Sequence, residues 1–537
     1  MITLTIALAL LTLFIIVALA YPDRFVGTKA RPDLPGPRGV PLLGNLFQLL
    51  PHRRRMLQRL SELEGQYGEL FTFTMPGRGR SIVINRPEWL EHVRKHDGTR
   101  YSKGSTALAV FKEFPGARSA FGSEGQLWKH SRRIMQPIFM SQSFDRHVAR
   151  ALNETIPVLR NFLHKAAESG VVFDFNEFCG RYSLEVLCKA TMNLDTAVLT
   201  SDPACLSTDH KMMHTVSILN HISSGRLHNP LWRLTEMLDG SRSAFHSARE
   251  DLFAVVDKLV CDRTATADAQ TTTHAQLESD SDSDGDFLSA LLSDPSITDP
   301  VLLRDTLITL LFAGRDTTQN ALAWSLYELS RRPAWVDRMR EEAIRVGGGT
   351  ETIRHDEVHS YPIHLAVLHE TLRLWPGAPK NARLALSDDV LPSVPEHGYR
   401  HPVRVSKGDY VLWSDYAMMR NCKVLILTDL VAHRLSWRDQ PHLIQVWGPD
   451  AREFNPARHL DAHGQFVKPP QPRFHAFGAG PRLCPGSRLA TYEFVSFWAA
   501  LLPLFDFVPV EAGERFPADA LTMSMEGSFM VAVKSRV

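Results

Sequence analysis

The amino-acid sequence begins with an apolar run, residues 2–20, that contains no charged side chain. About 20 apolar residues in a helix that rises 1.5 Å per residue match the hydrocarbon core of a bilayer. Basic residues follow the run as far as Arg38, which favours a cytosolic location for everything after it. We therefore predict a single-pass membrane anchor over residues 1–21, with the body of the chain in the cytosol.

A cleaved signal peptide is the alternative interpretation of this run, because Ala18-Leu19-Ala20 resembles a signal cleavage site. Cleavage there would give a secreted protein. The absence of a basic residue before the run, and its length, favour the retained anchor. Residues 22–41 follow as a basic hinge rich in proline and glycine, which predicts a stiff connector to a body over residues 42–537.

The body combines a short strand pattern with many helical ones. Aromatic and β-branched residues alternate over 70–85 on both sides of a Pro-Gly turn, which predicts a β-hairpin. Helical spacing of apolar residues recurs over 87–96, 127–139, 144–167, 175–192 and 487–502. The Ser/Thr/Asp-rich run 264–286 has too few apolar residues to pack, so it predicts a flexible surface loop. The pattern favours a mainly α fold with small β-sheets.

The longest helical pattern covers residues 300–332, with Asp299 placed as N-cap and Pro333 as terminator. A helix so long and so apolar is expected to pass through the core of the body. Its middle, Ala313-Gly314-Arg315-Asp316-Thr317-Thr318, interrupts the aliphatic pattern with small and polar residues. Such residues inside a core helix indicate a functional site.

Charge and cysteine content exclude several classes of protein. The chain of 537 residues has 60 Lys and Arg against 59 Asp and Glu, so we expect no nucleic-acid partner. No internal repeat is found, which favours one large catalytic body. The six Cys have no paired short spacing, which argues against a disulfide scaffold or a zinc ribbon. An important Cys must therefore act singly.

A glycine-rich loop near the C-terminus carries one such Cys. The loop runs from Phe477 to Gly486, and Cys484 lies just before the predicted helix 487–502. Glycines let a backbone approach a planar ligand, and the N–H groups at a helix start favour a thiolate. This pattern is typical of a soft metal ligand. A buried Cys in an ordinary glycine-rich loop is the alternative.

The loop matches F-x-x-G-x-R-x-C-x-G and resembles the cysteine-ligand loop of the cytochrome P-450 superfamily. The resemblance implies the mainly helical cytochrome P-450 fold with small sheets, preceded here by one N-terminal transmembrane helix. It also implies a haem b cofactor contacted by Phe477 and Arg482, with Cys484 as the axial thiolate of the iron. Further motifs follow in the family's order over nearly the whole chain from the hinge onward.

Two of these motifs imply a structural role. Glu370 and Arg373 form the family's E-x-x-R on one helix face, and the Arg of a later loop, here Arg458, is expected to complete their network behind the haem. From physical chemistry alone, a solvent-exposed pair is the commoner interpretation of Glu370 and Arg373.

A third motif, W-x-x-x-R, is matched by Trp128 and Arg132, and the resemblance implies that both reach one haem propionate. Arg383 and Arg482 resemble the other propionate partners. A buried carboxylate needs such cations.

The middle of the long helix resembles the family's oxygen-activating segment. The resemblance implies that Gly314 and Thr317 permit a local distortion of the helix and that Asp316 and Thr317 relay protons. The alternatives are a Thr that bonds to its own helix and an Asp exposed on the far face.

The resemblance implies a haem-thiolate monooxygenase, and with the predicted anchor we expect it in the endoplasmic reticulum membrane. We expect it to take electrons from an NADPH-cytochrome reductase, with cytochrome b5 as a second donor, and to hydroxylate a lipophilic substrate. Residues 313–318, 369–374 and 388–392 resemble fungal and plant fatty-acid and alkane terminal hydroxylases, so a long-chain fatty acid is the first expectation. A terpenoid, polyketide or glycolipid intermediate is the alternative. A non-catalytic haem-binding protein would not need Asp316 and Thr317.

Two further expectations concern segments. Substrate contacts are expected from five of them, 108–114, 212–231, 311–318, 379–383 and 523–528. Residues 421–445 depart from the family's pattern, and their aliphatic run 424–427 is unusual for a surface loop. We interpret them as a lineage-specific insertion or as the translation of an unspliced intron.

Overall fold

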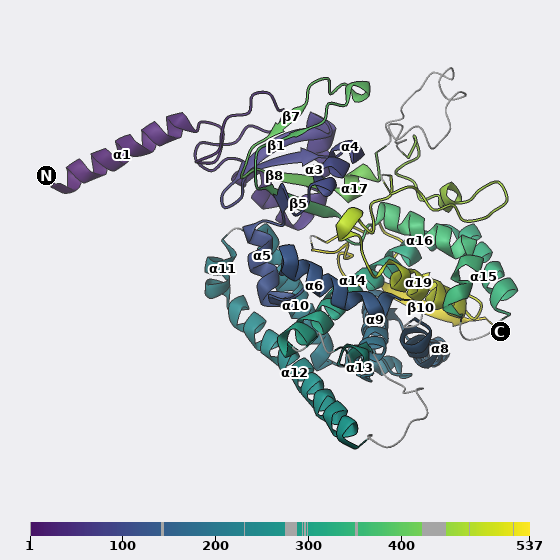
Figure 1. The fold of residues 1–537 in the computed structure, drawn as a ribbon. Coiled ribbons are helices and arrows are strands. Elements are labelled where there is room, and N and C mark those ends of the chain that lie inside the picture. The colour runs from purple at the N-terminus through teal and green to yellow at the C-terminus, as the bar shows by residue number, and fades with distance from the viewer. Residues whose placement is uncertain are drawn as a thin grey trace.

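The computed structural model describes residues 2–140, 144–229, 231–273, 287–292, 294, 297, 299–348, 353–421, 447–471, 473–518 and 520–536. The described part is mainly helical with small sheets, as the sequence predicted (Figure 1). Its α-helices are α1 Ile2–Ala20, α2 Leu46–Leu49, α3 Met56–Tyr67, α4 Pro87–Lys95, α5 Ser105–Phe111, α6 Gly125–Met135, α8 Ala149–Ser169, α9 Phe175–Met192, α10 Lys211–His228, α11 Trp232–Asp239, α12 Ser241–Thr273, α13 Phe287–Leu292, α14 Pro300–Leu329, α15 Pro333–Gly347, α16 Pro362–Leu374, α17 Asp415–Met418 and α19 Ser487–Leu501. Its strands are β1 Leu70–Met75, β2 Gly79–Ile84, β3 Tyr101–Ser102, β4 Phe173–Asp174, β5 Lys380–Ala385, β6 Asp389–Leu391, β7 Val403–Val405, β8 Tyr410–Ser414, β9 Phe505–Pro509 and β10 Met530–Ser535.

The predicted hairpin is confirmed and forms one edge of the largest described sheet. β1 and β2 pair antiparallel from Leu70 opposite Ile84 to Met75 opposite Gly79. The strand order is β1-β2-β8-β5-β3, with β8 parallel to β2. This sheet brings the β1–β2 turn and β5, which carries Arg383, into one layer beside the helical body (Figure 1).

The predicted long helix is α14, and it passes through the core. The Asp299 carboxylate caps it by accepting from the backbone N–H of Val301 at 3.0 Å. α14 packs against α9, α16 and α19, and Trp324 near its end is fully buried between neighbouring aromatic rings. The predicted terminator Pro333 begins α15. The core thus holds the middle of α14 in a fixed position.

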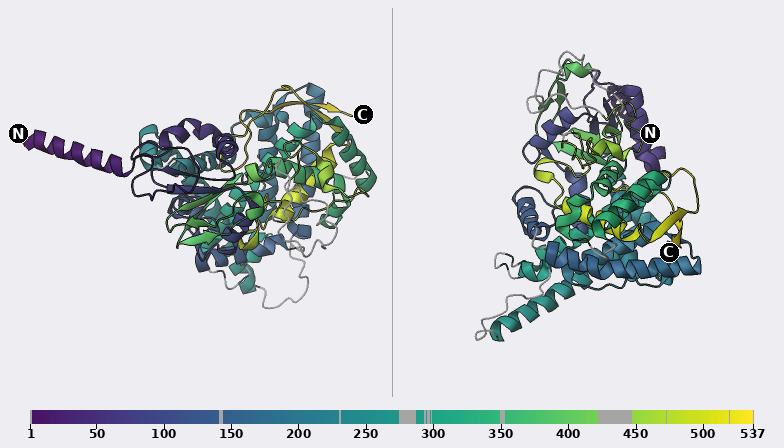
Figure 2. Two further views of the ribbon diagram at one scale, coloured as in Figure 1. Left: turned by 90° about the horizontal axis from the view of Figure 1, so that it is seen from above. Right: turned by 90° about the vertical axis from the view of Figure 1, so that its right-hand side faces the viewer.

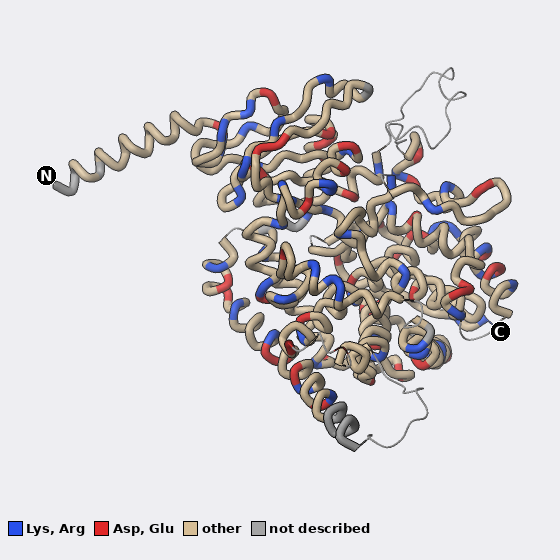
Figure 3. Tube along the Cα trace, viewed as in Figure 1, with Lys and Arg blue, Asp and Glu red and all other residues tan. Residues whose placement is uncertain are grey.

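The N-terminal apolar run forms α1, which projects from the body in Figure 1 and in the left-hand view of Figure 2. It carries no charged side chain along its described length (Figure 3), and large apolar side chains such as Leu10 and Leu19 are exposed. Even so, among the described residues no helix has both the length and the hydropathy needed to cross a membrane. The predicted transmembrane helix is therefore not confirmed.

The predicted flexible loop 264–286 is wrong over its first part. Residues 264–273 continue α12, where the Thr264 hydroxyl donates to the Val260 carbonyl at 2.7 Å. Extending a helix that already exists adds one hydrogen bond per residue without a new nucleation step, so polar residues can prolong it without burying apolar area. Residues 274–286 and 422–446 lie outside the described residues, so the predicted loop end and insertion stay predictions.

Candidate haem and oxygen site

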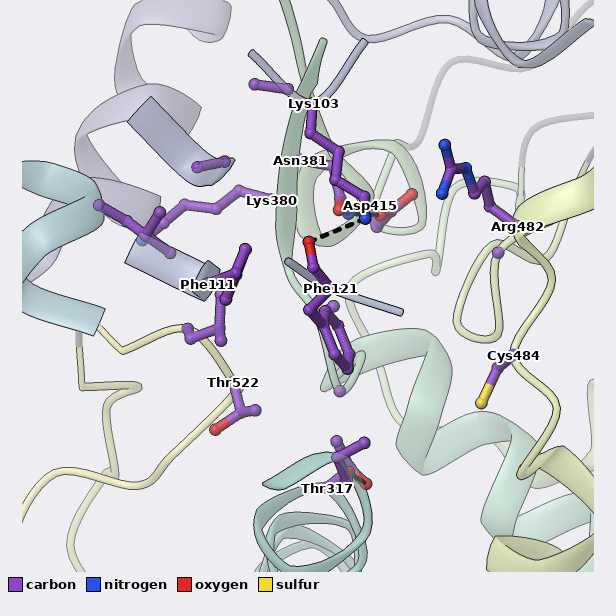
Figure 4. A pocket seen from close by; sticks show the side chains of 18 of the residues that line it. Lys103, Phe111, Phe121, Thr317, Lys380, Asn381, Asp415, Arg482, Cys484 and Thr522 are labelled. Carbon is purple, nitrogen blue, oxygen red and sulfur yellow. Dashed lines mark hydrogen bonds between the residues drawn. The ribbon is translucent and has the colours of Figure 1, made fainter. Parts of the chain in front are cut away.

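One cavity of about 840 Å³ brings together most of the predicted site residues. It lies between α6, the middle of α14, β5 and the loop before α19, and Figure 4 shows part of its wall. The predicted residues that line it are Trp128, Arg132, Thr317, Arg383, Phe477, Arg482 and Cys484. Asp316 is not among the lining residues.

The Cys484 sulfur points into the cavity from the loop before α19 (Figure 4). The backbone N–H of Cys484 donates to the Phe477 carbonyl at 2.8 Å, which closes the loop, and Gly478 and Gly480 have φ of 72° and 63°. Burial raises the pKa of the Cys484 thiol, although the Gly486 backbone and Arg132 act in the opposite direction. The protein groups by themselves therefore favour the thiol over the thiolate that the sequence predicted, and an iron ion held by Cys484 would take the place of its proton.

Arginines gather on the wall above this loop. Arg482 lies over the Trp128 ring at 3.7 Å, and Arg132 donates to the Leu483 carbonyl. Arg383 Nε donates to Asp97 at 3.0 Å, and Arg482 Nε lies 3.5 Å from the same carboxylate. One buried acid thus holds two of the predicted propionate partners in place.

Sequence reasoning missed Asp97 and Lys103 in this group. The Lys103 ammonium donates hydrogen bonds to the carbonyls of Ala120, Phe121 and Ser123 at 2.6–2.8 Å. Figure 4 shows the bond to Phe121. Burial, followed by repulsion from Arg482, lowers its pKa to about 7. Neither residue belongs to a motif that the sequence singled out. Arg383, a partner of Asp97, lies far away along the chain, and the partners of Lys103 are backbone carbonyls, which any residue type supplies, so no local pattern could have identified either residue.

The predicted structural network is present, and it is buried. Arg373 donates to both carboxylate oxygens of Glu370 at 2.8 Å, Arg458 Nε donates to it at 3.2 Å, and both side chains of the first pair are fully buried. Burial opposes ionisation, but hydrogen bonds from Arg373 and His459 lower the pKa of Glu370 to about 2. His459, which binds Glu370 at 3.0 Å, is a member that the sequence did not reveal.

The middle of α14 is a continuous helix, so the predicted distortion does not break it. The Thr317 hydroxyl donates to the Ala313 carbonyl at 2.8 Å. The Asp316 carboxylate accepts hydrogen bonds from Arg315 at 2.8 Å and from Asn220 of α10 at 2.7 Å. Thr317 therefore lies on the cavity wall, whereas Asp316 lies behind it. Their roles in proton transfer stay predictions.

Above Thr317 the cavity wall is largely apolar. Phe111, Phe121 and Phe312 pack with ring centroids 5.2–6.2 Å apart. Four of the five segments expected to contact substrate contribute lining residues. The fifth, 523–528, does not, because its neighbours Leu521 and Thr522 reach the wall instead. An apolar cavity with a few polar groups suits a lipophilic guest.

These residues fit a haem. A sulfur ligand faces the cavity from one loop, and the buried Arg482 Nη1 has no hydrogen-bond partner, which suits a propionate. Haem bound through a thiolate supplies the activation of dioxygen. In that arrangement Cys484 would hold the iron, while Trp128, Arg132, Arg383 and Arg482 would hold the propionates.

Comparison with known proteins agrees with this geometry. The family model described as cytochrome P450 matches residues 34–425 and 442–531, and the interruption falls inside the predicted insertion. "Cytochrome P450 monooxygenase cyp1" of Mycosarcoma maydis is 31% identical over 92% of this chain and 72% of its own length. "Cytochrome P450 94A1" of Vicia sativa is 26% identical over 93% of this chain and 90% of its own length. The chain therefore belongs to the cytochrome P450 family and is a haem-thiolate monooxygenase.

Proposed function

We propose that this monooxygenase hydroxylates a long-chain fatty acid or a related aliphatic chain. The apolar wall that leads to Thr317 and Cys484 carries this proposal, because it suits an extended hydrocarbon rather than a polar molecule. The resemblance of residues 313–318 and 369–374 to terminal hydroxylases agrees with it.

In this proposal each residue of the wall has a definite task. The rings of Phe111, Phe121 and Phe312 exclude water and orient the chain. Thr317 holds a proton at Oγ1 within the cavity and can exchange it with a guest or a water molecule. Asp316, held by Arg315 and Asn220, would exchange protons with Thr317 only through water, because no direct hydrogen bond joins the two described side chains.

We further propose that α1 anchors the protein in the endoplasmic reticulum membrane with the body in the cytosol. An uncharged apolar run over residues 2–20 and the exposed apolar side chains of α1 support this location. The electron donor would then be the NADPH-cytochrome reductase of that membrane, with cytochrome b5 as a second donor. Retention of the intact chain in membranes after a carbonate wash tests the anchor.

Two measurements on microsomes that contain the chain test the proposed function. The reduced CO difference spectrum first establishes that the haem has a thiolate ligand, with Cys484→Ala as the negative control. Product analysis with hexadecanoic acid, hexadecane and a terpenoid alcohol then identifies the substrate class. Hydroxylated hexadecanoic acid or hexadecane supports the proposal. Oxidation of the terpenoid alone, by a protein with a normal spectrum, overturns it.

A further inference from the structure

The cavity reaches the protein surface where the β1–β2 turn meets α10 and α11. Gly77 of the turn and Arg233 of α11 both line the cavity and are exposed to solvent. Arg78, also in the turn and lining the cavity, donates to the Leu227 carbonyl at the end of α10. Two arginines from separate elements thus lie at one opening.

Neither arginine has an acidic partner in the described part of the chain. No ion pair joins Arg78 or Arg233 to a described carboxylate, and Arg233 lies on the Trp232 ring at 4.5 Å. The only carboxylates among the described residues that line the cavity are Asp97 and Asp415. Asp97 already pairs with Arg383 and Arg482. The opening therefore carries uncompensated positive charge.

The nearby acids are held by another arginine. Arg226 of α10, which is 1% exposed, pairs with Glu236 at 2.7 Å and with Glu113 at 2.9 Å, and it lies over the Trp232 ring at 4.3 Å. This network ties α11 to α10 and uses the carboxylates of the region. Burial lowers the pKa of Arg78, which has no such partner. An anion beside a desolvated guanidinium would remove that penalty.

An apolar path leads inward from the opening. Met75 and Phe73 of β1 line the cavity next to the turn, and Phe111 and Phe312 line it next to Thr317. One cavity thus combines a cationic opening, an apolar wall and the proposed reaction site at Thr317 and Cys484. An amphipathic chain with a negative head group matches this order of surfaces.

We propose that Arg78 and Arg233 bind the carboxylate of a long-chain substrate, so that the other end of the chain points toward Thr317 and Cys484. The inference rests on the proposed function and adds the head group and the end that is oxidised. A carboxylate has about four acceptor sites on its two oxygens, so one head group has enough of them to accept hydrogen bonds from two guanidinium groups.

Binding of a matched pair of ligands tests this proposal. Hexadecanoic acid and hexadecan-1-ol are titrated against the haem-loaded protein, and the ligand-induced change in the haem spectrum gives each Kd. Loss of a charge-assisted hydrogen bond predicts that Arg78→Gln and Arg233→Gln each raise the Kd of the acid about 10-fold. The Kd of the alcohol should change less than about 2-fold, and Arg78→Lys should recover part of the affinity. Arg338→Gln is the control, because Arg338 is exposed on the Trp335 ring and does not line the cavity.

The outcomes separate this inference from the proposed function. An equal change for acid and alcohol, or no change for either, overturns the carboxylate site. So does a weaker association of the variants with vesicles of anionic lipid at unchanged acid affinity, because the arginines would then contact the membrane surface. A selective loss of acid affinity supports the site. If the variants lose acid affinity selectively but the wild type forms no hydroxylated product from the acid, the proposed function is overturned and the carboxylate site is supported.

Discussion

The Thr318 hydroxyl donates to Glu493 Oε2 at 2.9 Å and joins α14 to α19 in the core. Glu493 is 1% exposed, and its other oxygen has no hydrogen-bond partner. Burial raises the pKa of Glu493 to about 8, although the bond from Thr318 acts in the opposite direction. At neutral pH the carboxyl group is therefore largely protonated in the folded protein. Glu493 is therefore an uncharged acid in the core, bonded to Thr318, which lines the cavity.

The raised pKa of Glu493 predicts that the stability of the protein depends on pH. From about pH 4.5 to about pH 8 the unfolded chain releases a proton that the folded protein keeps, so the free energy of unfolding falls as pH rises. Glu493→Gln removes the titration but keeps an oxygen that can accept from Thr318. We expect the Tm of the wild type to fall relative to that of the variant between pH 5 and pH 8, as measured by thermal scans. A parallel pH dependence of the two Tm values would contradict the raised pKa.

The Glu370 network predicts a large loss of stability on mutation. Glu370→Ala leaves Arg373 and Arg458 without their shared carboxylate, and removal of one partner from a buried ion pair costs about 3–5 kcal/mol. The expected result is poor folding or a much lower Tm. Glu62→Gln breaks the exposed pair with Arg59 at the same sequence spacing and serves as the control, with an expected effect below about 1 kcal/mol. Similar losses for both variants would show that the network is not what stabilises this region.

These two pairs show what the sequence can and cannot reveal. Arg59–Glu62 and Glu370–Arg373 have the same spacing of three residues, so spacing alone cannot tell an exposed pair from a buried one. The family resemblance, which joins this pair to Arg458 behind the haem, did indicate the buried pair. The hairpin, α14 and the Cys484 loop were predictable because their signals are local.

Other features depend on contacts between distant segments. Asp97 meets Arg383 because β3, which follows the end of α4, pairs with β5, and no local pattern records that contact. The end of α12 was missed for a different reason, since polar composition indicated a loop where an existing helix simply continues.

Thr317 and Asp316 should contribute unequally to catalysis. Thr317→Ala removes a hydroxyl from the cavity wall, and loss of a positioned proton donor typically lowers a rate by about 10²-fold or more. Asp316→Asn keeps an oxygen for Asn220 outside the cavity, so we expect a smaller loss. The rate of product formation per haem is the measurement, and Thr317→Ser, which restores the hydroxyl, is the control. Equal loss in Thr317→Ser and Thr317→Ala would mean that the methyl group matters and the proton does not.

Deletion of residues 421–445 should preserve the haem site. The Met419 carbonyl accepts from Arg373 at 2.6 Å and the Trp447 carbonyl accepts from Arg458 at 3.0 Å, so groups on both sides of the segment hold the Glu370 network without it. The family match is interrupted between residues 425 and 442, which agrees with a segment that other members lack. We expect the deletion variant to give the same CO difference band as the full chain, with equal or higher haem content. If the band is lost only in the deletion variant, the segment belongs to the fold, and the transcript should then contain it.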